Sequence, residues 1–444
     1  MTSPVLVWLR RDLRLDDSHA IGRALERGGP VAFLYVLDPA MKARGVGHAQ
    51  LGFIVEGLGD LHARLAERGG GLIVRRGDAV SHLVDVAREL GASVVVANRD
   101  EEPAAGVVER AAEDALREAG VELEVVDDEV NVPHELVATK EGRPCRTYSA
   151  YARAVRRVLA ELPAPPVEHD LAGRLLAVPV PEIPTVETLV GRPVSLRADV
   201  PGGETPALAR LRGWRDDGGM ARYADDRDLV AEPEATSRLS AYLRQGMLSP
   251  RRALQVADRG GAAKWASELL WRDWFKYVLH HHPDLAERCV DERFDRIVWT
   301  GSDEHFDAWS RGETGFGMVD AAMRQLLETG SIANRARMVA ASFLVKDLHV
   351  DWRRGEQWFR RHLADGDLAS NAGSWQWVAG VGLDAAPYFR VFNPDLQEAK
   401  FDPTGAYAAR WAPDRPLRIV DHAVERDRAL AAYKAVAAEL GDPS

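Results

Sequence analysis

The first 130 residues or so alternate short apolar runs with helical stretches, and this alternation constrains the fold more than any other feature. Because buried apolar strands separated by helices are typical of parallel sheets covered on both faces, it predicts a doubly wound parallel α/β domain. No GxGxxG motif follows the first run, so a Rossmann dinucleotide site is not supported. The expected strands are residues 5–9, 31–37, 72–75, 93–97 and 122–126, and the expected helices are 18–27, 50–68, 80–90 and 104–119.

The character of the chain changes further along. Residues 162–206 are rich in proline and lack sustained periodicity, which predicts a long connector on the surface or between domains. From residue 205 onward strand signals vanish, amphipathic helices follow one another as far as 423–440, and most of the 12 tryptophans occur. The sequence therefore predicts an α/β domain over 1–130, an interdomain linker over 131–204 and an all-helical domain over 205–444.

Composition excludes several classes of protein. The 444 residues contain no apolar run near the ~20 residues that a membrane span requires, and the apolar start of the chain leads straight into charged residues. Cys145 and Cys289 are isolated, which excludes a disulfide framework or a four-thiolate cluster within one chain and favours a reducing, cytoplasmic location. The net charge of −11 argues against coating of nucleic acid through bulk charge, although arginines late in the chain allow a local basic patch.

Residues 365–377 contain several candidate functional side chains close together in the sequence. Asp365, Asp367 and Asn371 are short polar side chains on a glycine-punctuated segment, and Trp375 and Trp377 follow at once. Alone, such a segment is more often a turn or helix cap followed by core tryptophans. Its functional interpretation depends on the other motifs of the helical half.

A second motif groups hydroxyls around a guanidinium. Residues 236–240, Thr-Ser-Arg-Leu-Ser, come just before or at an expected helix start, where hydroxyls, backbone N–H groups and Arg238 can bind phosphate oxygens. The alternative is an N-cap with a solvated arginine. Tyr223 lies upstream, at a spacing that allows it to join the same pocket.

Two helices combine polar and aromatic groups on one face. Within residues 264–281, Glu268, Trp271 and Arg272 share a face, which indicates either a cavity wall or an exposed i,i+4 ion pair beside core residues. In a later helix Asn334 shares a face with Arg337 and Met338. Met338 alone would be a core residue, whereas a helix interior disfavours Asn334 unless its amide is used.

Together these segments resemble the photolyase/cryptochrome family, and most closely the class I cyclobutane pyrimidine dimer photolyases. The resemblance covers nearly the whole chain, with long motifs in the order of the family. They read VLVWLRRDLRLDDS at 5–18, ATSRLSAYLRQGMLSPR at 235–251, ELLWRDWF at 268–275, GETGFGMVDAAMRQL at 312–326, NRARMVAASFLVKDLHVDWRRGE at 334–356, DGDLASNAGSWQW at 365–377 and DAAPYFRVFNPDLQEAKFD at 384–402.

The resemblance implies a U-shaped, non-covalently bound FAD in the helical domain. In the family, the residue at the position of Asn371 lies opposite flavin N5, and the residues matching 236–240 meet the pyrophosphate. The positions that match the FAD contacts of the family are Tyr223, Thr236, Ser237, Arg238, Leu239, Ser240, Arg272, Asn334, Arg337, Asp365, Gly366, Asp367 and Asn371.

The resemblance also implies an electron route and a substrate pocket. Trp375, Trp352 and Trp299 match the three tryptophans that carry electrons between flavin and surface. The residues matching the pocket for the flipped-out dimer are Glu268, Trp271, Asn334, Met338 and Trp377. The positions that approach DNA are Arg227, Arg272, Asn334, Arg335, Arg390 and Gln397.

A second, light-harvesting chromophore is implied at the N-terminal domain. The acids Asp100 and Glu102 match the contacts of the deazaflavin-binding branch, whereas 104–105 are alanines where the folate branch has an Asn-Glu pair. A deazaflavin or another flavin is therefore favoured over folate, with an empty pocket as the alternative. The chain also departs from the family at 330–333, where Gly-Ser-Ile-Ala replaces Gly-Trp-x-His.

The expected function is light-driven repair of DNA. In this hypothesis photoexcited reduced FAD donates an electron to a pyrimidine dimer, the cyclobutane ring opens, and the electron returns. A cryptochrome-type blue-light receptor is the main alternative, and a flavoprotein that transfers electrons without light is the third. The expected partner is UV-damaged DNA, the expected state is a monomer with no membrane association, and no metal site is expected.

Overall fold

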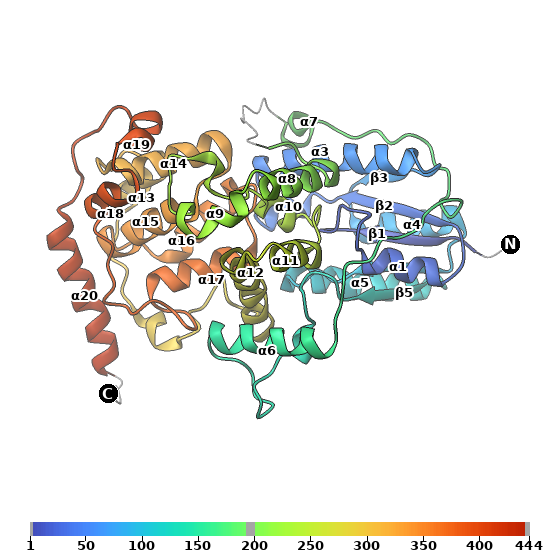
Figure 1. The fold of residues 1–444 in the computed structure, drawn as a ribbon, viewed down its shortest axis with the longest axis horizontal. Coiled ribbons are helices and arrows are strands. Elements are labelled where there is room, and N and C mark those ends of the chain that lie inside the picture. The colour runs from blue at the N-terminus through green and yellow to red at the C-terminus, as the bar shows by residue number, and fades with distance from the viewer. Residues whose placement is uncertain (1–2, 192–199, 440–444) are drawn as a thin grey trace.

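The computed structural model of the protein describes residues 3–191 and 200–439 (Figure 1). Its N-terminal part holds one parallel five-stranded sheet in the order β3-β2-β1-β4-β5. The predicted strands are confirmed to within one residue at each end. They are β1 (Val5–Leu9), β2 (Val31–Leu37), β3 (Leu72–Arg76), β4 (Val94–Asn98) and β5 (Glu122–Val126).

Helices cover both faces of the sheet, because both faces of its central strands are apolar. Val5 and Val7 of β1 share a core with α1 and α3, whereas Leu6 and Trp8 share a core with α4 and α5. This alternation is that of a doubly wound sheet. The helices are α1 (His19–Glu26), α2 (Ala40–Ala43), α3 (His48–Ala66), α4 (Ala79–Leu90) and α5 (Pro103–Glu118), of which the short α2 was not predicted.

The expected linker contains more regular structure than its composition suggested. It includes the 3-10 turn η1 (His134–Leu136) and the helices α6 (Tyr148–Glu161) and α7 (Val186–Val190), whereas residues 192–199 lie outside the described residues. Helix α6 forms because Thr147 caps its first turn and Tyr151 packs against Trp274 and Tyr277, with ring centroids 5.4 and 5.1 Å apart. Helix α6 precedes the proline-rich stretch 162–206, and neither α6 nor the short α7 within that stretch was predicted.

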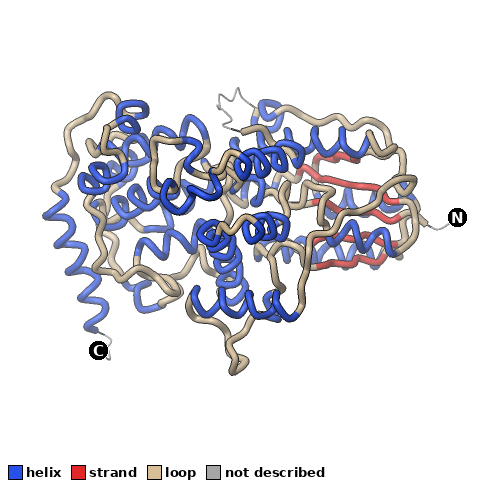
Figure 2. Tube along the Cα trace, viewed as in Figure 1, coloured by secondary structure: helices blue, strands red, loops and turns tan. Residues whose placement is uncertain are grey.

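The helical part fills the rest of the molecule, and the strands are confined to the opposite end (Figure 2). Among the described residues, no helix combines the length and the apolar character of a membrane span. The helices are α8 (Glu204–Asp216), α9 (Gly219–Asp226), α10 (Ser240–Arg244), α11 (Pro250–Arg259), α12 (Ala263–His281), α13 (Asp303–Arg311), α14 (Gly317–Thr329), α15 (Asn334–Ser342), α16 (Trp352–His362), α17 (Leu368–Ala379), α18 (Pro394–Phe401), α19 (Ala406–Trp411) and α20 (His422–Glu439). Residue 440, the last of the expected C-terminal helix, lies outside the described residues.

One apolar core joins the two parts of the chain. It extends from the α1 and α3 face of the sheet into α8, α10, α11 and α12. The two parts approach closely where Gly57 of α3 meets Met247, because a Cβ atom at Gly57 would lie 2.1 Å from the Met247 methyl. The sheet and the first helices of the helical part therefore share a buried interface.

Helices α12 and α17 pack against each other. Phe275 of α12 meets Gly373 of α17 so closely that a Cβ atom at Gly373 would lie 2.2 Å from its ring, and the next residue, Lys276, lies 3.1 Å from Asp367. Tyr148, which stacks on Trp271, donates its backbone N–H to Asp384 at 2.9 Å, and the Ala386 N–H donates to the Trp377 carbonyl at 3.2 Å. Trp271 and Trp377 therefore both lie near residues 384–386.

Candidate functional site

One hollow lies between α3 and the segment that leads into α10. This cavity, called here the main cavity, has a volume of about 250 Å³. Arg238, Ser240 and Asp365, three of the expected cofactor contacts, line it. Small residues make room on the other side, namely Ala49, Gly52, Gly330, Ser331 and Ala364.

The 236–240 loop on the wall of the main cavity is held in an unusual backbone conformation. Arg238 has a φ of +55°, which is uncommon for a residue with a side chain. Arg210 of α8 fixes this loop, because its guanidinium donates to the carbonyls of Ser237 at 2.9 Å and Thr236 at 3.2 Å. The sequence motif gave no sign of Arg210, which acts from a helix about 30 residues upstream.

Asp365 is anchored at the cavity wall by Arg337 of α15. The Nη2 atom of Arg337 donates to both carboxylate oxygens, at 3.0 and 2.9 Å, and its Nε donates to the Ile332 carbonyl at 2.9 Å. Two of the expected cofactor residues therefore form one ion pair. Ser331 lines the main cavity where the family carries tryptophan, so this wall lacks an indole.

Asp367 lies deeper, among several cations. It caps α17 by accepting from the Ser370 backbone at 2.8 Å, and it lies 3.1 Å from Lys276, 3.8 Å from Arg11 and 3.9 Å from Arg244. Burial raises the pKa of Asp367, but these three cations outweigh it and hold that pKa well below its ordinary range. The carboxylate stays charged at any physiological pH.

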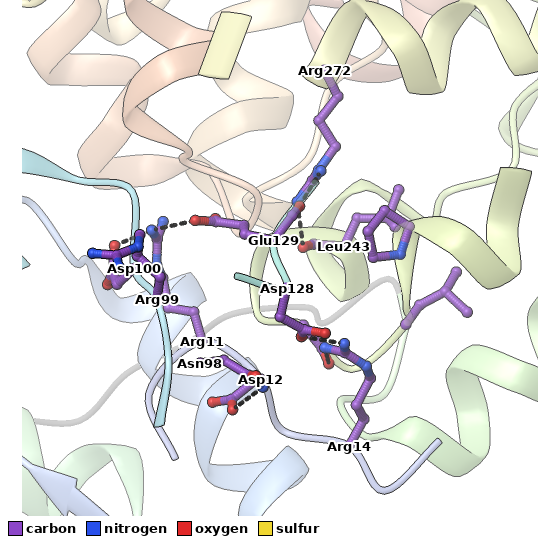
Figure 3. A pocket seen from close by; sticks show the side chains of 13 residues that line it. Arg11, Asp12, Arg14, Asn98, Arg99, Asp100, Asp128, Glu129, Leu243 and Arg272 are labelled. Carbon is purple, nitrogen blue, oxygen red and sulfur yellow. Dashed lines mark hydrogen bonds and ion pairs between the residues drawn. The ribbon is translucent and has the colours of Figure 1, made fainter. Parts of the chain in front are cut away.

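Arg272 lies at the seam between the two parts of the chain rather than on the wall of the main cavity. It lines a much smaller hollow of about 10 Å³ with Arg11, Asp128 and Glu129, called here the seam hollow (Figure 3). Its guanidinium donates to the Glu129 carbonyl at 2.9 Å and to Asp273 at 2.7 Å. Only 14% of its side chain is exposed, so in this conformation it is not a surface residue.

Asn371 follows Asp367 by one turn of α17 and is buried. Its amide nitrogen donates to the backbone carbonyl of Glu356 at 2.8 Å and to the carboxyl of Glu356 at 3.0 Å. Glu356 belongs to α16, so this pair joins two helices that also carry Trp352 and Trp375. Burial raises the pKa of the Glu356 carboxyl.

Glu268 lies between two cations rather than in open solvent. It forms an ion pair with Arg227, and Lys264 of the same helix approaches it at 2.9 Å. The Arg227 guanidinium also lies 5.8 Å from the centroid of the Tyr223 ring, on α9. Tyr223, an expected cofactor contact, is therefore grouped with Glu268 and Arg227 and is absent from the lining of the main cavity.

Further arginines continue this cationic group. Arg335 pairs with Asp228 at 2.9 Å and lies 4.3 Å above the Phe401 ring, and Asp228 in turn lies 3.9 Å from Arg227. Arg390 is exposed, 5.8 Å from the Trp377 ring. These are three of the expected DNA-binding residues.

The remaining expected substrate residues lie on α12, α15, α17 and α18. One face of Trp271 is covered by Tyr148, with parallel rings 3.9 Å apart, and Trp377 is half-buried. Asn334 is exposed and donates to the Met338 sulfur at 3.7 Å. Gln397 of α18 is half-buried, and its carbonyl oxygen has no hydrogen-bond partner among the described residues.

The three expected electron-transfer tryptophans differ in exposure. Trp375 and Trp352 are buried, and Trp299 is half-buried. Trp375 packs on Gly355, which lies one turn along α16 from Trp352. Two residues after Trp299, the Gly301 amide donates to the His349 carbonyl at 2.9 Å, which joins this segment to the residues before α16. A fourth tryptophan, Trp309, meets Trp375 edge to face at 6.1 Å, a contact that the linear sequence did not reveal.

Another hollow, of about 80 Å³, lies at the carboxyl ends of β1, β2 and β4 and is called here the sheet-end hollow. Asp100 and Glu102, the expected antenna contacts, both line it. Arg11 binds both acids, and Arg244 donates to Glu102 at 2.9 Å. Ligands of doubly wound folds bind at this edge of the sheet, next to the point where the strand order reverses.

Two family models match the chain. One describes DNA photolyase and covers residues 5–168, and the other describes the FAD binding domain of DNA photolyase and covers residues 265–415. A curated deoxyribodipyrimidine photo-lyase of Thermus thermophilus is 40% identical over 98% of this chain and 99% of its own length. The chain belongs to the DNA photolyase family. As a member of that family it contains an FAD-binding domain, in agreement with the sequence prediction.

Solved structures of photolyases have the same fold. A bacterial class III photolyase from Agrobacterium tumefaciens matches with a TM-score of 0.87 at 36% identity, covering 98% of each chain. An archaeal photolyase from Sulfolobus tokodaii, described as holding two FAD molecules with a novel light-harvesting cofactor, matches with a TM-score of 0.82 at 27% identity and covers 97% and 100% of the two chains.

The ion pairs of Asp367 predict that replacing this residue lowers the stability of the photolyase. Asp367→Asn removes a buried charge and leaves its cations short of a partner, so the free energy of unfolding should fall by about 3 kcal/mol at neutral pH. Asp395→Asn, in an exposed pair with Arg418, should change it by about 1 kcal/mol or less. Urea unfolding of the three proteins measures both effects.

The pH dependence of the free energy of unfolding tests whether the effect comes from the charge of Asp367. Because the pKa of Asp367 is lower in the folded than in the unfolded chain, its stabilisation is complete above the unfolded value of about 4 and is lost as the pH falls further. The gap between wild type and Asp367→Asn should therefore narrow below pH of about 4. A gap that stays constant down to acid pH would contradict the assignment.

Proposed function

We propose that this photolyase splits cyclobutane pyrimidine dimers in DNA, using light absorbed by reduced FAD. The observation that carries the proposal is that Trp271, through Tyr148, and Trp377 both lie near residues 384–386. Arg227 and Arg335 are paired with Glu268 and Asp228, and Arg390 lies 5.8 Å from the Trp377 ring. Damaged bases and DNA phosphates would meet aromatic faces and guanidinium groups there.

The residues around the main cavity fit FAD. Arg238 and Ser240 offer a guanidinium and a hydroxyl, which suit a pyrophosphate, and the small residues opposite leave room for a bulky cofactor. When bound and reduced, FAD supplies an electron on absorbing blue light. Asp365 and Arg337 would orient it through their ion pair, and Asn371, fixed by Glu356, would present its amide to the ring system.

The substrate side supplies binding and orientation. The exposed part of Trp271 and the ring of Trp377 would stack on the flipped-out bases, with Asn334 and Met338 at the edge of the pocket. Tyr148 covers one face of Trp271, so stacking requires the other face or movement of Tyr148. Glu268, held by Arg227 and Lys264, would hydrogen-bond the dimer in a fixed orientation.

Repair of a defined substrate tests the proposal together with the role of Glu268. The reduced, FAD-loaded protein should restore thymine absorbance when illuminated with a dimer-containing oligonucleotide. Glu268→Ala should lower the repair yield at least ~10-fold, because a positioned hydrogen bond to developing charge contributes more than 1.4 kcal/mol. Binding to undamaged DNA should change much less.

Glu292→Ala is the matched control, since this glutamate is 76% exposed on its side chain and lies outside the group around Glu268. It should repair like wild type. Absence of repair by the wild-type protein would favour the cryptochrome-type receptor, and equal yields for the two variants would remove Glu268 from the mechanism.

The buried tryptophans are proposed to carry electrons from the surface to the cofactor. Trp375→Phe keeps the packing against Gly355 but removes the indole, and it should slow photoreduction of oxidised FAD at least ~10-fold, which corresponds to ~1.4 kcal/mol in barrier height. Repair by chemically reduced protein should remain, because the substrate side is unchanged. Transient absorption measures the first effect.

Trp265→Phe serves as the control for an indole in the other core, where it packs on Trp214 at 5.2 Å. Its photoreduction rate should match wild type. If Trp375→Phe photoreduces at the wild-type rate as well, the electron takes another route, and Trp309, in contact with Trp375, is the next residue to replace.

We further propose that the sheet-end hollow holds the second chromophore, a deazaflavin or another flavin. Arg11 and Arg244 hold Asp100 and Glu102 at its wall, and aromatic and aliphatic side chains, among them Tyr35 and Met41, complete it. Carboxylates beside an apolar wall suit the polar edge and flat face of a flavin ring.

Titration of the FAD-loaded protein with a deazaflavin and with FMN tests this proposal. Glu102→Gln should weaken chromophore binding about 10-fold, since a hydrogen bond to a charged group contributes roughly 1.5–3 kcal/mol. Glu109→Gln is the matched control, because Glu109 pairs with Arg10 at 3.1 Å but is not part of the lining. Equal affinities for the two variants, or no binding by wild type, would contradict the assignment.

A further inference from the structure

Three segments that are far apart in the sequence bring together a carboxylate and two imidazoles. Glu101 follows β4, His134 lies in η1 of the connector, and His280 lies in the last turn of α12. One potential ligand atom from each residue lies within 4.8 Å of the other two. No motif in the sequence predicts this group, because its members come from three separate elements.

His134 is the unusual member of the group. Its side chain is only 2% exposed, yet neither of its ring nitrogens has a hydrogen-bond partner among the described residues. Its Nε2 lies 3.6 Å from the Glu101 carboxylate, beyond hydrogen-bond distance. Since buried polar groups almost always have a partner, an imidazole left unpaired beside two ligand-type groups indicates a bound species.

We propose that Glu101, His134 and His280 bind a divalent transition-metal ion, for which Zn²⁺ is the best match. Two imidazoles and one carboxylate are the ligands that suit zinc, whereas magnesium and calcium require mostly oxygen ligands. Three protein ligands leave a fourth tetrahedral position for water, and His280 is exposed, so the ion has an entry path.

The surrounding charges are compatible with such an ion. Lys276, a cation that acts on both Glu101 and His134, is held by Glu129 at 2.5 Å and Asp367 at 3.1 Å, so its charge is already balanced. Burial, together with His280 and Lys276, lowers the pKa of His134 to about 3, which keeps its imidazole neutral and able to bind metal. The proposal rests on the positions of the three side chains, and a neutral His134 imidazole is consistent with it.

The ion would join three segments of the chain. Glu101 belongs to the α/β part, His134 to the connector and His280 to the helical part. A metal that binds only the folded protein raises its stability according to its concentration relative to Kd. The site is therefore a cross-link at the seam, separate from the residues proposed for repair.

Calorimetric titration of the tag-free, FAD-loaded protein with ZnCl₂, after treatment with a chelator, tests the proposal. The wild type should bind one Zn²⁺ per chain, and its thermal midpoint should rise with added zinc. His280→Ala should weaken binding at least ~10-fold and abolish the rise in thermal midpoint. His280 is exposed at a helix end, so this variant should fold.

His282→Ala is the matched control, because this histidine follows at the same helix end but is not in the group. It should bind zinc like wild type. Glu101→Gln, which keeps the size of the side chain, should lose binding like His280→Ala. Failure of the wild type to bind, or equal binding by His280→Ala and His282→Ala, would overturn the proposal whatever the repair assay shows.

Discussion

The arrangement of the two parts of the chain depends on the ion pairs of Arg11. Its guanidinium binds Asp100 and lies 3.0 Å from Glu102, 3.1 Å from Glu129 and 3.8 Å from Asp367. These acids come from the loop after β4, the connector and the start of α17. Burial lowers the pKa of Arg11, but the four carboxylates outweigh it and raise that pKa well above its ordinary value.

This network has consequences for both proposed sites, because it is buried. Removing an ion from water costs several kcal/mol, and the cost is recovered only if every charge has its partners. Asp367 is consequently fixed at the first turn of α17, which sets the positions of Asn371, Trp375 and Trp377 further along the helix. Arg11 also binds the acids of the sheet-end hollow. One set of charges therefore orients the walls of both the sheet-end hollow and the seam hollow.

The sequence predicted elements well where periodicity is strong and missed what depends on packing between distant segments. All five strands agree within one residue. β1 and β2 are continuous apolar runs between turn signals, whereas β5 alternates glutamate with apolar residues at its start. Helix α6 was not predicted, although its Thr147 cap and the i,i+4 spacing of Tyr151 and Val155 are helical signals. The contact of Trp309 with Trp375 and the Glu101–His134–His280 group required three-dimensional information, since neither has a local signal.

The charge of the protein limits how it can recognise DNA. With a net charge of −11, the chain as a whole repels a polyanion, so attraction depends on a few guanidinium groups. In the proposed function these groups are Arg227 and Arg335, which are paired with Glu268 and Asp228, and Arg390, which lies 5.8 Å from the Trp377 ring. Few phosphate contacts imply weak binding to undamaged duplex, and in the proposed function most of the preference for damage must come from stacking and hydrogen bonds to the extruded bases.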